Sequence, residues 1–367
     1  MEYIFNDILE IKNGKNQKAV ENSDGKYPIF GSGGVMGYAD DYICEPNTVI
    51  VGRKGSINNP IFVEERFWNV DTAFGLQAKR EKLNPRFLYY FCRKFDFTKL
   101  NKTVTIPSLT KSDILKIKID LPDLNEQQSV VDKLLLIERI IANRKKELEQ
   151  FDNLIKARFV EMFGDPVRNS KCLPVLPMTE VCEIIDGDRG KNYPKQEEFF
   201  EDEYCLFLNA KNVTSQGFNF SERMFITKGK DEVLRKGKLN RGDVVLTTRG
   251  TLGNIAFYAE DVPFENIRIN SGMVILRMNR SIIDEEFFIE QFRMQVDDIK
   301  KAVASGSAQP QLPISTMNKI SVIMPDLNVQ REFSVFANQV NKSKVAIQKV
   351  LDETQTLFDS LMQEYFG

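Results

Sequence analysis

The sequence predicts an α+β protein with an internal repeat, in which a mixed α/β domain followed by one long helix occurs twice. The segment Pro122-Asp123-Leu124-Asn125-Glu126-Gln127 returns 203 positions later as Pro325-Asp326-Leu327-Asn328-Val329-Gln330. Residues 161–164 return at the same spacing as residues 364–367. Between these ends, apolar residues recur three and four positions apart, which is the spacing of one helix face. The first domain would span residues 1–121. A polar linker, residues 165–170, and the second domain would together span residues 165–324, and the helices would span residues 122–164 and 325–367.

Each long helix has recognisable ends and an apolar seam. Asn125 is placed to cap the first helix with Gln128 three residues later, and Gly164 followed by Pro166 ends it. About 37 helical residues rise roughly 55 Å at 1.5 Å each. The seams predict a coiled coil, and they comprise Val130, Leu134, Ile137, Ile141, Leu148, Phe151, Ile155 and Met162 in the first helix and Phe333, Ala337, Val340, Ile347, Leu351, Phe358, Leu361 and Tyr365 in the second, with polar breaks at Arg144, Arg158, Lys344 and Thr354.

The composition favours a binding protein over an enzyme. The chain has 367 residues, of which 42% are apolar, so it is long enough for two or three domains with their own cores. It contains no histidine, which removes the commonest catalytic base and the imidazole metal ligands. Its five cysteines are never spaced as CxxC, so they are most simply core thiols. We therefore expect no catalytic residues, no metal and no cofactor.

The distribution of charge points to two basic regions. The formal net charge is only -2, but residues 49–118 hold 14 Lys and Arg against 6 Asp and Glu, and residues 206–250 hold 9 against 4. The first residues lack the pattern of a signal peptide, and no apolar run approaches the ~18 residues of a membrane span. We expect a cytoplasmic protein.

A basic turn follows a predicted strand in the first domain. Val49, Ile50 and Val51 form a β-branched run, and Arg53, Lys54, Ser56 and Asn58 come directly after it. Residues 31–34 form a second, glycine-rich loop. Glycine lets a backbone approach a phosphate, and Arg or Lys neutralises it, so both loops are candidate phosphate contacts. The alternative is an ordinary hairpin turn with solvated charges.

The same order of strand, cation, glycine and hydroxyl returns in the second domain, 195 positions later. Its candidate contacts are Thr248, Arg249, Thr251 and Asn254. Each domain also contains a hydroxyl-rich segment further along the chain, from which Lys102, Thr103 and Ser307 are further candidates.

Two polar segments of the second domain, residues 186–193 and 208–213, have no clear counterpart in the first domain. Asn, Arg and Lys suit bidentate contacts with adenine and guanine edges, so these segments are candidate base-reading loops. Loops that diverged without constraint are the alternative. The candidate residues are Arg189, Lys191, Asn192 and Lys211.

Together these features resemble the DNA specificity subunits of type I restriction-modification systems. The resemblance rests on three features. The first is the order of domain and helix, and the second is the turn at residues 248–254. The third is the segment Leu121-Pro122-Asp123-Leu124-Asn125-Glu126-Gln127-Gln128, which is similar to that family's L-P-x-x-x-E-Q-Q. The second copy departs from the motif at Val329 and Arg331. The resemblance implies two target recognition domains that read a bipartite double-stranded DNA site, separated by antiparallel helices. It also implies two methyltransferase subunits and an endonuclease or translocase as partners, with no catalysis in this chain.

Apolar residues outside the seam are too many for one coiled-coil interface and are candidate contacts for these partners. Packing against the chain's own domains is the alternative. A scaffold whose domains bind protein rather than DNA is the second functional hypothesis. The candidate partner contacts are Leu135, Leu136, Ile140, Phe159, Phe336, Val350 and Leu357.

Overall fold

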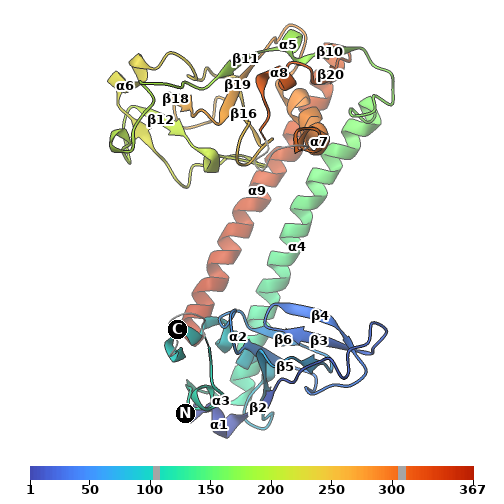
Figure 1. The fold of residues 1–367 in the computed structure, drawn as a ribbon, viewed down its shortest axis with the longest axis vertical. Helices are drawn as coiled ribbons and strands as arrows, with labels where there is room; N and C mark the ends of the chain where they lie inside the picture. Colours follow the sequence, from blue (N-terminus) through green and yellow to red (C-terminus); the bar gives the residue numbers. More distant parts are fainter. Residues whose placement is uncertain (102–107, 305–310) are drawn as a thin grey trace. The chain divides into compact units, whose positions relative to one another are not determined.

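The computed structural model describes residues 1–101, 108–304 and 311–367, which form two compact units (Figure 1). The first unit comprises Met1–Lys146 and Ile347–Gly367, and the second comprises Glu147–Ala346. Two helices of 40 residues each, α4 (Leu124–Phe163) and α9 (Leu327–Phe366), contribute to both units. Each unit therefore combines one mixed α/β domain with the start of one long helix and the end of the other, which confirms the predicted α+β class and its internal repeat.

The first unit contains two main sheets (Figure 1). One has the order β2 (Leu9–Asn13), β8 (Ala73–Ala78), β5 (Thr48–Gly52), β6 (Ile61–Val63), and the other β4 (Gly34–Ala39), β3 (Tyr27–Gly31), β7 (Trp68–Asn69). β1 (Glu2–Ile4) pairs with β9 (Lys118–Asp120). The helical elements are α1 (Phe5–Ile8), α2 (Pro85–Lys94), η1 (Phe97–Leu100) and α3 (Lys111–Ile114).

The second unit repeats this plan. Its sheets have the orders β11 (Cys182–Asp186), β19 (Met273–Met278), β16 (Val244–Thr247), β17 (Ile255–Phe257) and β15 (Phe225–Ile226), β12 (Cys205–Leu208), β18 (Ile267–Ile269). β10 (Val175–Pro177) pairs with β20 (Ser321–Ile323), and a further hairpin joins β13 (Val213–Thr214) to β14 (Gly217–Phe218). The helical elements are α5 (Met178–Val181), η2 (Gln196–Glu198), η3 (Ala210–Asn212), α6 (Lys228–Val233), α7 (Glu285–Ala304) and α8 (Ile314–Met317). In both units one strand pair is parallel, β3 with β7 and β12 with β18.

The repeat begins earlier than the sequence indicates. A Cβ atom on Gly14 would lie 1.8 Å from the carbonyl oxygen of Val70, and one on Gly187 would lie 2.3 Å from that of Asn270. Both glycines follow the first strand of the four-stranded sheet and allow the same close backbone approach. The prediction that residues 186–193 lack a counterpart is therefore wrong at their start, because a lone shared glycine is too weak a sequence signal.

The start of each long helix is held by a buried glutamine. Gln127 donates through Nε2 to the carbonyls of Lys82 and Pro122, both at 3.0 Å, and its Oε1 accepts from the backbone N–H of Asn84 at 2.8 Å. The side chain is completely buried. It therefore connects the first turn of α4 to the segment that begins α2.

Gln330 makes the same three bonds in the second unit. Its Nε2 donates to the carbonyls of Ile282 at 3.1 Å and Pro325 at 2.8 Å, and its Oε1 accepts from the N–H of Asp284 at 3.0 Å. We call this arrangement the glutamine clamp. The clamp explains why both copies of the motif have a glutamine at this position, Gln127 and Gln330, although the neighbouring residues differ.

Aspartate, rather than asparagine, caps these helices. Asp123 Oδ1 accepts from the N–H groups of Asn125 and Glu126, and Asp326 Oδ1 accepts from that of Asn328. The predicted cap at Asn125 is therefore wrong by two residues, because Leu124 is already the first helical residue. At the other end Gly164 takes a φ of 78°, which favours glycine and ends α4.

An aromatic pair closes each unit against the end of the other long helix. The rings of Phe87 on α2 and Phe366 on α9 are 4.8 Å apart, and those of Phe287 on α7 and Phe163 on α4 are 4.9 Å apart, both edge to face. In the first unit Lys133, near the start of α4, lies over the ring of Tyr365, near the end of α9. The helices therefore run antiparallel within the unit.

The predicted seam is largely buried, but it is not the whole of the helix packing. Lys344, a predicted polar break, pairs with Asp152 on the facing helix of the second unit. Phe159 is fully buried and stacks on Phe287 at 5.4 Å. The prediction that Phe159 contacts a partner is therefore wrong, and the alternative of packing against its own domain holds there.

Four of the five cysteines are buried, as the sequence predicts. Burial raises the pKa of the Cys205 and Cys182 thiols to about 12, and Cys44 and Cys92 are also buried. Cys172 is exposed and so departs from the expected core position.

Within the described ranges, every helix is too short or too polar to cross a membrane.

We predict that Gln127→Ala lowers the free energy of unfolding by about 3 kcal/mol, because three buried hydrogen bonds worth about 1 kcal/mol each are lost. Urea unfolding of the full chain measures this. The matched control is Gln339→Ala, which changes an exposed glutamine of α9, and a change under about 0.5 kcal/mol is expected for it. Equal stability of the two variants would contradict a structural role for the clamp.

Candidate nucleic-acid interface

The first basic turn, residues 53–56, extends from a rigid support. It follows β5, which is buried along its whole length. The N–H of Arg53 donates to the carbonyl of Thr72 at 2.7 Å, and the N–H of Leu109 donates to the carbonyl of Arg53 at 2.9 Å. Gly55 takes a φ of 77°, and Arg53, Lys54 and Ser56 are exposed. The backbone is fixed while the polar side chains face outward.

The second basic turn, residues 248–251, is supported in the same way. The N–H groups of Thr248 and Arg249 donate to the carbonyl of Gly272 at 2.8 and 3.2 Å, and the N–H of Leu312 donates to the carbonyl of Thr248 at 3.0 Å. Gly250 takes a φ of 71°. Arg249 and Thr251 are exposed. Lys54 and Arg249 thus occupy equivalent positions in the two units.

Three predicted contact residues are used by the fold itself. The Thr248 hydroxyl is buried and donates to the carbonyl of Gly272 at 3.0 Å. Asn254 Nδ2 donates to the carbonyl of Val213 at 2.9 Å. The amide of Asn58 donates to Asp96 and accepts from the N–H of Phe97, so it holds the start of η1. The hydrogen-bonding groups of these side chains serve to shape the turns.

The candidate base-reading loops of the second domain are partly engaged within the protein. Arg189 donates to Asp186 at 3.1 Å and to the carbonyl of Ser271 at 3.2 Å, while remaining half exposed. Asn192 donates to the carbonyl of Val233 at 3.3 Å. Lys211 pairs with Glu222 at 2.7 Å, and Lys191 is exposed. Lys102, Thr103 and Ser307 lie outside the described residues.

A basic loop that sequence reasoning missed lies beside Arg189. Arg235 and Lys236 are exposed, and the N–H of Arg235 donates to Asp188 Oδ2 at 2.6 Å. The other oxygen of Asp188 accepts from the N–H of Arg189 at 2.7 Å. A surface hollow is lined by these residues together with Asp186 and Gly187. The nearly buried carboxylate of Asp188 thus holds the backbone at Arg189 and Arg235, and these two residues and Lys236 line one hollow.

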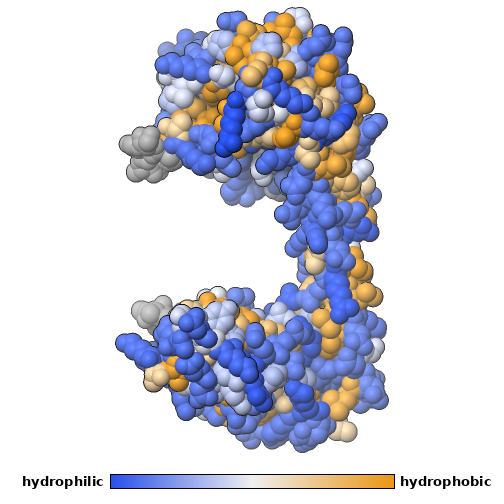
Figure 2. Space-filling model, turned by 90° about the vertical axis from the view of Figure 1, so that its right-hand side faces the viewer, coloured by the Kyte–Doolittle hydropathy of each residue, from blue (hydrophilic) through white to orange (hydrophobic). Residues whose placement is uncertain are grey.

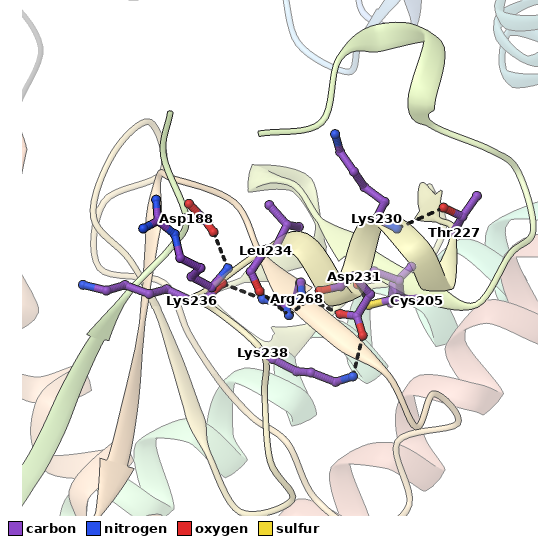
Figure 3. Close-up of polar contacts among 11 residues, drawn as sticks. Asp188, Cys205, Thr227, Lys230, Asp231, Leu234, Lys236, Lys238 and Arg268 are labelled. Carbon is purple, nitrogen blue, oxygen red and sulfur yellow. Dashed lines mark hydrogen bonds and ion pairs between the residues drawn. The ribbon is translucent and has the colours of Figure 1, made fainter. Parts of the chain in front are cut away.

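A buried ion pair between Arg268 and Asp231 is hydrogen-bonded to the backbone of this loop (Figure 3). Arg268 is only 5% exposed and donates to the carboxylate of Asp231 and to the carbonyls of Leu234 at 3.0 Å and Lys236 at 2.7 Å. Burial raises the pKa of Asp231, but hydrogen bonds from Lys238 and Arg268 outweigh it and hold the pKa below its usual value. The sequence signal was only the excess of Lys and Arg between residues 206 and 250.

The remaining candidate residues are the apolar partner contacts on the two long helices. Figure 2 shows apolar side chains at the surface of the helical part among mostly hydrophilic residues. Leu136, Ile140, Val350 and Leu357 are exposed, whereas Leu135 and Phe336 are partly buried. No group of three or more His, Cys, Asp or Glu that could hold a metal ion is found among the residues that the structure describes. The arrangement supports binding through cations and exposed apolar side chains.

Comparison with known proteins identifies the family. A model described as "Type I restriction modification DNA specificity domain" matches residues 2–150 and 175–354. The chain is 21% identical to the type I restriction enzyme MjaIX specificity subunit of Methanocaldococcus jannaschii over 85% of this chain and 73% of that one. It is also 21% identical to a putative type I specificity subunit of Haemophilus influenzae, over 95% and 86%.

Solved structures show the same fold. The S subunit of a type I restriction-modification system from M. genitalium superposes with a TM-score of 0.66 at 18% identity, covering 100% of this chain and 96% of that one. A chain from a study of type I restriction-modification complex assembly and conformational transition gives 0.54 at 15% identity, covering 100% and 97%. The two matches of the family model cover most of the sequence, so the chain belongs to the type I restriction-modification DNA specificity family, whose members are non-catalytic specificity subunits.

Proposed function

We propose that this chain reads a bipartite double-stranded DNA target, with residues 1–121 and 165–324 as the two target recognition domains and residues 122–164 and 325–367 as spacer helices. The observation that carries the proposal is the basic turn with the same anchoring in both units. Lys54 and Arg249 project from equivalent, buried strands, although the surrounding loops differ. Two such positions on one repeated frame suit two readers of unlike half-sites.

The charges fit contacts with the DNA backbone. Arg and Lys neutralise phosphates, and hydroxyl groups and backbone N–H groups add contacts that position a protein on the duplex. Arg53 and Lys54 in the first turn and Arg249 in the second are exposed, and their backbone groups are held by hydrogen bonds. Ser56 and Thr251 are exposed in the same turns. Arg235 and Lys236 extend the basic surface of the second domain.

We predict that Arg249→Ala, or Arg53→Ala with Lys54→Ala, weakens binding of the full chain and its complex to DNA. The slope of log affinity against log salt concentration should fall by about 1 for each phosphate contact removed, and by similar amounts on cognate and unrelated DNA. Fluorescence anisotropy over a salt series measures both quantities.

The matched control is Arg168→Ala, which removes an exposed arginine from the linker. An unchanged salt slope in folded turn variants would remove these turns from the interface. Absence of salt-dependent DNA binding by the unaltered chain would instead favour the protein-binding scaffold.

The exposed apolar positions on the long helices fit the docking of partner subunits. Leu154 on α4 and Leu357 on α9 are 203 positions apart, which is the repeat spacing, and they are 46% and 51% exposed. One belongs to each unit. We therefore propose that two methyltransferase subunits dock on the long helices at equivalent sites, that endonuclease or translocase subunits join the full complex, and that the complex acts in the cytoplasm.

We predict that Leu154→Asp and Leu357→Asp each remove one methyltransferase subunit from the purified complex, and that the double variant removes both, because a charge opposes burial of an apolar contact. Sedimentation or native mass spectrometry of the complex gives the number of subunits. Val233→Asp places the same charge at an exposed apolar position away from the long helices and should leave assembly unchanged. Full assembly of a folded double variant would contradict this docking site.

A further inference from the structure

The glycine-rich loop of the first domain is the tip of a hairpin that lies against the first basic turn. β3 and β4 pair from Tyr27 with Ala39 to Gly31 with Gly34, which leaves Ser32 and Gly33 as a two-residue turn. A Cβ atom on Gly52 would lie 3.1 Å from Cβ of Ser32. Because Gly52 directly precedes Arg53, the hairpin tip and the cations share one surface.

The exposed side chains beside this tip are apolar. Val35 is 57% exposed and Met36 62% exposed, and the Met36 sulfur lies 2.7 Å from the place where a Cβ of Gly31 would stand. Met36 thus lies across the hairpin where glycine leaves room. Exposed apolar side chains beside paired cations are typical of a surface that another molecule covers.

This edge of the sheet is less suited to strand addition by another protein than to contact with DNA. β4 is the edge strand of its sheet, but the N–H of Asn22 already donates to the carbonyl of Tyr38 at 2.9 Å, and Glu21 forms a bridge with Ala39. The far end of the strand is therefore covered. A two-stranded ribbon does fit the major groove of DNA, where apolar side chains contact the thymine methyl group.

A hairpin also lies next to the second basic turn. It is not the counterpart of β3–β4, because β12, which pairs parallel with β18 as β3 does with β7, pairs with β15. The contact of Asn254 Nδ2 with the carbonyl of Val213 joins the second basic turn to the β13–β14 hairpin. The Thr214 hydroxyl donates to the carbonyl of Gly217 at 3.0 Å and accepts from the N–H of Gln216 at 3.2 Å, which closes the tip. Buried Asn212 donates to the carbonyls of Asn219 at 3.0 Å and Glu222 at 2.7 Å and so holds the base of the hairpin.

The two hairpins carry different side chains, each next to a basic turn. Ser215 and Gln216 at the second tip are polar and exposed, where Val35 and Met36 in the first domain are apolar. Gln can bond the N6 and N7 edge of adenine with two hydrogen bonds, and apolar side chains favour thymine.

We infer that these two hairpins read the bases, through Val35 and Met36 beside the first tip in one half-site and through Gln216 at the second tip in the other, while the adjacent basic turns hold the phosphates. This inference rests on the proposed DNA-reading function and specifies which residues give each domain its specificity.

The test is selection of sequences from a randomised duplex DNA library by the full chain in its purified complex. Val35→Ser with Met36→Ser is expected to lower the preference at thymine-containing positions of one half-site, on the order of tenfold at one base pair. Gln216→Ala is expected to lower the preference for adenine at a position of the other half-site by a similar factor. Neither variant should change the salt dependence of binding to unrelated DNA, because the phosphate contacts remain.

Matched controls are Val167→Ser and Gln196→Ala, which change exposed residues of the same types away from the hairpins. Unaltered sequence preference in folded hairpin variants would overturn the inference while leaving the proposed function intact. Loss of a protein subunit, with the DNA preference retained, would also overturn it, because the tip would then bind protein. If the unaltered complex selected no sequence, the proposed function itself would fail.

Discussion

A buried glutamine amide determines how each long helix joins its domain. The amide of Gln127 or Gln330 has both of its ends satisfied by backbone groups that lie more than 40 positions earlier in the chain as well as by its own helix start. A buried amide with an unmet hydrogen bond costs about 1–3 kcal/mol, so the clamp favours one arrangement of helix and domain. Phe366 and Phe163 then complete each unit from the opposite helix.

In this repeated fold, the residues that support the domains differ from those that we propose bind DNA. The four-stranded sheet, the glycine at the end of its first strand, and the glutamine clamp are the same in both units. The differences lie in loops and hairpins at the surface, where side chains can change without loss of the core. In the second unit the Arg268–Asp231 pair adds a buried support for cations, and removing one partner of such a pair leaves an uncompensated buried charge. A duplicated frame with unlike surfaces is suited to reading two unlike sequences.

The sequence was sufficient for the features that depend on periodicity and repetition. The long helices follow from apolar spacing and from Gly164, and the paired basic turns follow from the shared order of strand, cation and glycine. The sequence was insufficient where contacts between distant parts of the chain determine the role of a residue. Phe159 lies off the seam but is buried by α7, which a two-helix pattern does not include. Thr248 and Asn58 have side chains suited to DNA contacts, but their partners within the protein come from distant parts of the chain. Asp231 and Arg268 are 37 positions apart, and no local pattern indicates that they pair.

We propose that each domain reads one half of the target independently of the other. The most direct measurement is to map the DNA sequence recognised in cells by the unaltered chain and by a chimaera in which residues 172–324 come from another member of the family. We expect one half of the recognised sequence to change and the other half to be retained. A chimaera that assembles but recognises a sequence altered in both halves, or the original sequence in full, would contradict it.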